Sequence, residues 1–88
     1  MQFGKPERLI AMRDVRRALA DACSNTIRDH VRRGVLPKPI KLSSGPTAPS
    51  VWPEREIEAV VQARVAGKSE DELRVLVAGL VAQRQAAA

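Results

Sequence analysis

The sequence is poor in aromatic residues, cysteine and histidine, and each shortage narrows what the chain can be. Phe3 and Trp52 are its only aromatic residues, so the core must be built from aliphatic side chains, which pack well on helices and in short strands. A single cysteine, Cys23, excludes an internal disulfide. One cysteine with one histidine, His30, falls short of the ligand set of a structural zinc site. We therefore expect no metal and no cofactor.

Long apolar runs are missing as well. No stretch approaches the roughly 20 apolar residues of a membrane span, and the opening text MQFGKPER lacks the apolar segment of a signal peptide. We expect a cytoplasmic protein with no membrane partner. Because the sequence also has no glycine-rich phosphate loop and no nucleophile–base pair, we expect neither an enzyme nor a small-molecule substrate.

The chain does have an excess of positive charge, and this charge is unevenly distributed. The formal net charge is +5 over 88 residues. Residues 1–45 contain ten Lys or Arg and four acidic residues, whereas residues 46–88 contain five and six. A basic excess gathered in one half of a single small domain is typical of a face that binds a polyanion. From charge alone, nucleic-acid binding and simple solubility both stay open.

Apolar side chains recur at helical spacing in four segments. Residues 12–20 and 25–33 are predicted to form two short helices, and Gly34 ends the second as its left-handed C-terminal residue. Pro53 begins a third helix, which Gly67 ends. The third helix has the buried stripe Ile57, Val60, Val61 and Val65, and the fourth, after a capping box at Ser69 and Glu72, has the stripe Leu73, Leu76, Val77, Leu80 and Val81.

The segment between the second and third helices is extended. Residues 37–53 hold five of the six prolines, which excludes a helix there. Ile40 and Leu42 are the inward positions of a half-buried strand, and Val51 with Trp52 forms the returning strand beyond a long loop. Trp52 is expected to anchor the core. The sequence therefore predicts a mainly α fold with a two-stranded β-hairpin.

The order of these segments resembles the AlpA-type regulators and excisionases, which belong to the MerR-like winged-helix group. The resemblance covers residues 8–66, and the continuation through residues 66–69 is similar to members that assist site-specific excision. The matching text is Arg8-Leu9-Ile10, Asp14-Val15, Thr26-Ile27, Arg33-Gly34, Leu36-Pro37-Lys38-Pro39-Ile40-Lys41-Leu42, and Trp52 with Glu56-Ile57.

The resemblance implies a winged helix-turn-helix domain over residues 1–67, with the hairpin as its wing. Residues 68–88 add a C-terminal helix, which packs on the domain or self-associates and has a frayed end. Two features depart from the family. Its turn between the first two helices usually contains a glycine, and residues 20–23 have none; its wing usually carries an arginine near Gly45, where this chain has residues 46–48, Pro-Thr-Ala.

The second helix has one face to bury and one face free for DNA. At 100° per residue, Val31 and His30 lie on the same side as Ile27, so His30 is expected to pack rather than to bind DNA. The DNA-binding residues predicted on this helix are Ser24, Asn25, Arg28, Asp29, Arg32 and Arg33. Asp29 could accept a hydrogen bond from a cytosine amino group, but the spacing favours a role in orienting Arg32 and Arg33. Phosphate contacts are predicted for Arg13, Arg16 and Arg17 on the first helix and for Lys38, Lys41 and Ser44 in the wing.

The expected function is sequence-specific binding of double-stranded DNA. The resemblance implies an excisionase, or recombination directionality factor, that binds and bends DNA repeats of a mobile element, with an integrase as a candidate partner. The resemblance equally implies a second role, the regulation of transcription. The apolar stripe of the fourth helix either caps the core or forms a homo-oligomer on DNA. The alternative function is a protein-interaction module, an antitoxin or adaptor, that works through this helix.

Overall fold

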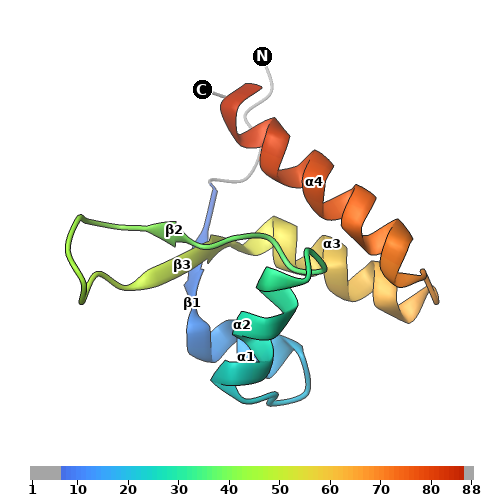
Figure 1. The fold of residues 1–88 in the computed structure, drawn as a ribbon, viewed down its shortest axis with the longest axis horizontal. Coiled ribbons are helices and arrows are strands. Elements are labelled where there is room, and N and C mark those ends of the chain that lie inside the picture. The colour runs from blue at the N-terminus through green and yellow to red at the C-terminus, as the bar shows by residue number, and fades with distance from the viewer. Residues whose placement is uncertain (1–6, 87–88) are drawn as a thin grey trace.

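Residues 7–86 form four helices and one antiparallel sheet in the computed structural model, which describes this part of the chain (Figure 1). All four predicted helices are present, so the mainly α class is confirmed. None of these helices within residues 7–86 combines the length and the apolar character that crossing a bilayer requires. The elements are β1 (Leu9–Ala11), α1 (Met12–Ala18), α2 (Ser24–Arg32), β2 (Ile40–Lys41), β3 (Ser50–Pro53), α3 (Glu54–Val65) and α4 (Glu70–Ala86).

The sheet has three strands, so the predicted two-stranded hairpin is incomplete. The strand order is β1-β3-β2, and both pairs are antiparallel. Ile10 lies opposite Trp52 on one side of β3, and Ile40 lies opposite Val51 on the other. The sequence analysis missed β1 because three residues are too few to show alternation, and because its partner strand is distant in the sequence.

The core lies where the sheet meets the helices. Trp52 is 1% exposed and donates its indole N–H to the carbonyl oxygen of Pro37 at 2.8 Å, as expected of a core anchor. Because Val77 of α4 belongs to the same core as α1, α2 and α3, residues 70–86 pack on the rest of the described chain. The core cluster consists of Ile10, Val15, Ile27, Leu36, Trp52, Ile57, Val60 and Val77.

Two apolar residues that were assigned to the core lie at the surface. Leu42 is 58% exposed, because β2 ends at Lys41 and the alternation does not continue beyond it. Val65 is 84% exposed; it is the last residue of α3, one turn beyond Val61, which still packs on the core. At the other end of the chain, the sequence predicts fraying over residues 85–88, but α4 continues through residues 85 and 86, and residues 87 and 88 lie outside the described residues.

The turn between α1 and α2 replaces the missing glycine with two left-handed residues. The backbone angle φ is 61° at Ala20 and 59° at Asp21. A side chain with a Cβ makes this conformation unfavourable by about 1–2 kcal/mol per residue. Hydrogen bonds compensate, since the Asp21 N–H donates to Arg16 O at 2.7 Å and Arg16 Nε donates to Ala22 O at 2.8 Å. Arg16 therefore holds this turn in place.

Ala20→Gly is expected to raise the free energy of unfolding by about 0.5–1 kcal/mol. Glycine removes the Cβ clash at positive φ, and its greater freedom in the unfolded chain offsets only part of the gain. Urea unfolding followed by far-UV circular dichroism measures the change. Ala78→Gly, at an exposed position inside α4, is the control and is expected to lower stability by about 1 kcal/mol. A lower midpoint for Ala20→Gly than for the wild type would contradict the strain at this turn.

Candidate nucleic-acid interface

The helix α2 has the two faces that its spacing predicts. Ile27 is fully buried and Val31 is half-buried, whereas Asn25, Arg28 and Arg32 are exposed. Arg28 Nη1 donates to Asn25 Oδ1 at 3.3 Å, so these two side chains lie together on the exposed face. The helix thus offers a row of hydrogen-bond donors to solvent while its apolar side holds it to the core.

The β2–β3 hairpin stands beside α2, and a groove runs between them. In Figure 1 the hairpin extends away from the helices as an arm that ends in the loop of residues 42–49. Lys41 of the hairpin donates from Nζ to Ser50 Oγ at 2.9 Å, which fixes the lysine at the groove. A basic residue of α2 and one of the hairpin therefore line one depression. The groove has a volume of about 300 Å³ and is lined by Met12, Ile27, Arg28, Val31, Pro39, Lys41, Ser50 and Trp52.

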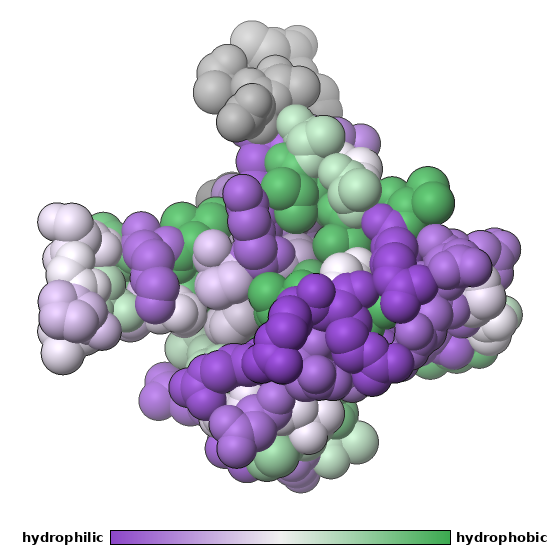
Figure 2. Space-filling model, in the orientation of Figure 1, coloured by the Kyte–Doolittle hydropathy of each residue, from purple (hydrophilic) through white to green (hydrophobic). Residues whose placement is uncertain are grey.

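Polar side chains dominate the surface around this groove. Figure 2 shows a continuous band of hydrophilic residues across the face on which α2 lies, and the band continues towards α4. Arg13 and Arg17 of α1 are exposed, and so are Lys38 and Ser44 near the hairpin, whereas Ser24 is half-buried at the start of α2. The residues predicted to contact phosphates are thus mostly at the surface, with Arg16 engaged in the α1–α2 turn.

Asp29 lies between two arginines of α2. Its carboxylate is 3.8 Å from Arg32 Nη1 and 3.4 Å from Arg33 Nη1. The Arg32 side chain is still 78% exposed, so the ion pair orients it without covering it. These contacts join the three residues that the predicted orienting role of Asp29 needs, and that role stays a prediction.

Arg33 connects the end of α2 to the first turn of α4. Its Nη2 is 2.5 Å from Glu70 Oε2, and its carbonyl oxygen accepts a hydrogen bond from Arg74 Nε at 2.9 Å. Gly34 ends α2 with a φ of 80°, and a Cβ at that position would lie 3.5 Å from Arg74 Cγ. Sequence analysis assigned Arg33 to DNA and missed these contacts because their partners lie 37 and 41 residues further along the chain.

A buried ion pair joins the far end of α4 to α3. Glu56 is 0% exposed, and its two carboxylate oxygens accept from Arg84 Nε at 2.9 Å and from Arg84 Nη2 at 2.6 Å. The same Nη2 donates to the carbonyl oxygen of Lys38 at 2.9 Å. Arg84 therefore holds α4 against both α3 and the segment that leads into β2. In the sequence, Glu56 stood out only as part of the text that matches the AlpA-type proteins, and no partner was predicted for it.

The apolar stripe of α4 is partly used within the chain. Leu73 is 2% exposed and Val77 is 6% exposed, so both pack against this chain's own core. For these two residues the structure agrees with the prediction that the stripe caps the core of its own chain. Leu76, Leu80 and Val81 are half-buried. Self-association through the stripe as a whole stays a prediction.

Two titratable residues, one within α2 and one just before it, have lowered pKa values. His30 is half-buried, and its Nδ1 is buried without a hydrogen-bond partner in residues 7–86. Burial lowers the pKa of His30, and the charges of Arg64 and Arg33 lower it further. Both effects favour the neutral imidazole. Cys23 is exposed at the N-terminus of α2, where a hydrogen bond with the Thr26 side chain lowers the pKa of its thiol.

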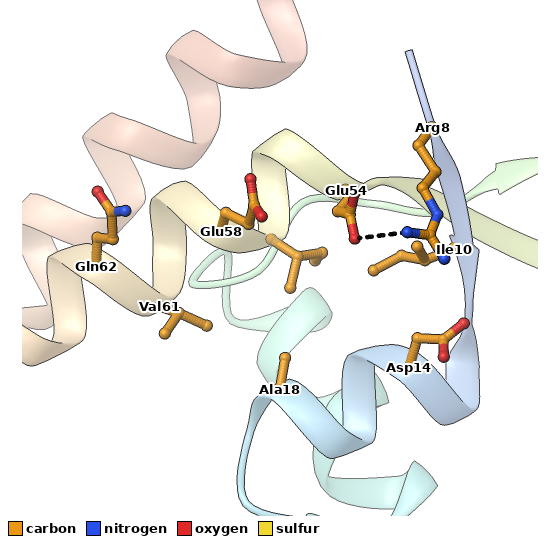
Figure 3. Close-up of a pocket in the computed structure, with 9 residues that line it drawn as sticks. Arg8, Ile10, Asp14, Ala18, Glu54, Glu58, Val61 and Gln62 are labelled. Carbon is orange, nitrogen blue, oxygen red and sulfur yellow. Dashed lines mark ion pairs between the residues drawn. The ribbon is translucent and has the colours of Figure 1, made fainter. Parts of the chain in front are cut away.

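Another groove, between β1, α1 and α3, has the opposite electrostatic character. It measures about 440 Å³, and Arg8 there is 3.6 Å from Glu54 across its edge (Figure 3). Asp14 and Glu58 also line it, so carboxylates outnumber basic groups. A polyanion would be repelled from this groove, which leaves the α2–hairpin side as the candidate interface. Within residues 7–86, no three His, Cys, Asp or Glu side chains are placed to share a metal ion.

Comparisons of this chain with protein families, with curated proteins and with solved structures find no match. The grounds for a function are therefore the shape and charge of the molecule itself. The features that bear on function are the exposed donors of α2, the adjacent hairpin and the groove between them.

Proposed function

We propose that the chain is a sequence-specific DNA-binding protein of the winged helix-turn-helix class. In this proposal α2 is the recognition helix and the β2–β3 hairpin is the wing. One observation carries it: Arg28 of α2 and Lys41 of the hairpin line the same groove, while Asn25 and Arg32 extend the exposed face of the helix. In proteins of this class the second helix of the pair enters the major groove, and neighbouring elements contact the phosphate backbone.

The side chains on the exposed face of α2 are chemically suited to read base edges. Arg28 and Arg32 lie one helical turn apart, and each guanidinium can donate two parallel hydrogen bonds to O6 and N7 of guanine. Asn25 can pair in a bidentate manner with N6 and N7 of adenine. Phosphate contacts come from Arg13 and Arg17 of α1 and from Lys38 and Lys41 of the wing. These contacts add affinity without sequence preference.

For the biological role we propose what the resemblance to AlpA-type proteins implies. The chain would bind and bend repeated sites in a mobile element as an excisionase, with an integrase as its partner, or regulate transcription of that element. The role needs no catalysis and no cofactor, and it places the protein on DNA in the cytoplasm. Footprinting separates the two outputs, because an excisionase protects an attachment site and a regulator protects a promoter.

The salt dependence of binding tests the proposed class. A duplex is first selected from a random pool, and its affinity is then measured by fluorescence anisotropy at rising NaCl concentration. With about five phosphate contacts, the slope of log K against log salt concentration is expected to be about −4 to −5, because each contact releases counterions. A flat response would contradict binding through the proposed phosphate contacts, and equal affinity for the selected duplex and for an unselected one would contradict sequence-specific binding.

Arg28→Ala and Arg32→Ala are each expected to weaken binding to the selected duplex by about 1–3 kcal/mol. Binding to unselected DNA should change little, since the lost contacts are with bases. Arg64→Ala is the control, because it removes the same charge from an exposed position on α3 outside the groove. If all three variants lose the same affinity on both duplexes, the arginines of α2 contribute only net charge.

A further inference from the structure

A groove between α3 and α4 forms an apolar surface that DNA binding does not use. Its volume is about 590 Å³. Ala59 and Ala63 of α3 leave space along one wall, and the half-buried Leu76 of α4 lies along the other. Val75 also lines the groove and is 75% exposed. The exposed Val75 side chain projects from this surface, and the small side chains of Ala59 and Ala63 leave a hollow beside it.

The groove opens on the side of α4 that faces away from α2. Glu70 and Arg74 contact Arg33 at the end of α2. Glu72 follows Glu70 by two residues and Leu76 follows Arg74 by two residues, and two residues correspond to about 200° around the helix. An occupant of the groove would therefore leave α2 and the hairpin uncovered.

The polar residues of the groove carry one charge of each sign. Lys68 and Glu72 both lie near the connection between α3 and α4. Glu72 accepts the Ser69 N–H through Oε1 at 2.8 Å, and its other carboxylate oxygen is available to a partner. A groove suited to a strongly basic or acidic partner would carry charge of one sign, whereas a pair of opposite charges is complementary to itself under two-fold rotation.

We propose that the groove binds a second copy of this chain in a two-fold symmetric dimer. An axis along the groove lays α3 of one copy over α4 of the other. Lys68 of each copy then faces Glu72 of the other, and Val75 of each enters the space beside Ala59 and Ala63. The four helices pack as a small bundle, in which every contact occurs twice. With few side chains lining the groove, we expect a weak dimer, with a dissociation constant of about micromolar order.

Sedimentation equilibrium of the full chain, from micromolar to near-millimolar concentration, tests the dimer. The wild type is expected to shift from monomer to dimer over this range. Val75→Glu would bury a carboxylate twice in the dimer and should raise the dissociation constant by about tenfold or more. Val65→Glu is the matched control, because Val65 is 84% exposed on α3 and does not line the groove. This variant should dimerise like the wild type.

Charge reversal tests the orientation of the two copies. Lys68→Glu alone should weaken the dimer severalfold, because it sets two carboxylates against each other in both of the symmetry-related contacts. The double variant Lys68→Glu with Glu72→Lys exchanges the charges and should recover most of the wild-type association. Circular dichroism follows the fold, since Glu72→Lys also removes the capping bond to Ser69. If the double variant does not fold, the dimer is tested by Lys68→Glu together with Val75→Glu and its control Val65→Glu.

Three results would overturn the proposal: a chain that stays monomeric at every concentration, equal behaviour of Val75→Glu and Val65→Glu, or a Lys68→Glu variant that dimerises as tightly as the wild type. The dimer does not depend on the proposed DNA binding. Val75→Glu assayed at dilute concentration on a single site should bind DNA like the wild type, so a failure of either proposal is seen separately.

Discussion

Arg84→Ala is expected to lower the free energy of unfolding by about 3–5 kcal/mol. The substitution leaves the carboxylate of Glu56, which is 0% exposed, without its partner, and it also removes the donor to Lys38 O. An unpaired buried charge costs several kcal/mol because it has lost its hydration. A domain of this size has a total stability of about 4–13 kcal/mol, so the expected loss is a large fraction of that total. Urea unfolding followed by far-UV circular dichroism measures the loss.

A paired variant separates the cost of the orphaned charge from the loss of packing. Replacing both partners, as Glu56→Leu with Arg84→Met, removes the buried charge and keeps apolar volume, so most of the stability should return. Arg84→Lys keeps the charge but loses the two parallel hydrogen bonds, and its stability should fall between the wild type and Arg84→Ala. The ion pair would be unimportant if Arg84→Ala unfolded at the same urea concentration as the wild type.

Trp52→Ala is the second substitution with a large expected effect, about 3–5 kcal/mol. Trp52 is 1% exposed on the central strand of the sheet, and its indole N–H binds Pro37 O at 2.8 Å. Removing it opens a cavity between the sheet and the segment that follows α2, and it leaves a buried carbonyl group without a donor. Circular dichroism is the measurement of choice, because Trp52 is the only tryptophan and its removal eliminates the fluorescence signal.

Trp52→Phe distinguishes the hydrogen bond from the packing. Phenylalanine fills much of the site but has no N–H, so a loss of about 1–3 kcal/mol is expected from the unsatisfied carbonyl of Pro37. Val65→Ala is the control for an apolar truncation at an exposed site, and it should change stability by no more than about 0.5 kcal/mol. If Trp52→Ala matched this control, the residue would not be the anchor of the core.

The sequence was sufficient for features that depend on nearby residues. Helical spacing placed Ile27 on the buried side of α2 and Arg28 and Arg32 on the exposed side, because a helix fixes directions within a few residues. The capping box at the start of α4 was predicted correctly for the same reason: Glu72 N–H donates to Ser69 Oγ at 3.2 Å, only three residues away. The exposed part of the candidate site could thus be predicted before the fold was known.

Features that depend on distant residues could not be found in this way. Periodicity gives no sign that Glu56 meets Arg84, which lies 28 residues further on, or that Arg33 meets Glu70. Arg33 and Arg16 looked like free cations in the sequence, yet one pairs with α4 and the other secures a turn. Periodicity also shows that one side of α4 is apolar without showing how much of that side the core needs. The answer depends on packing, which covers Leu73 and Val77.

The edges of the sheet affect how the protein behaves in concentrated solution. The central strand β3 is paired with a neighbouring strand along both of its edges. The outer strands are short, since β1 pairs through three residues and β2 through two. Exposed strand edges are the usual templates for fibrous aggregation, and short edges give an incoming strand few groups to bind. β1 also passes directly into α1 at Met12, which ends the edge. We therefore expect copies of this chain to stay soluble when crowded and to meet through helices rather than by extending the sheet.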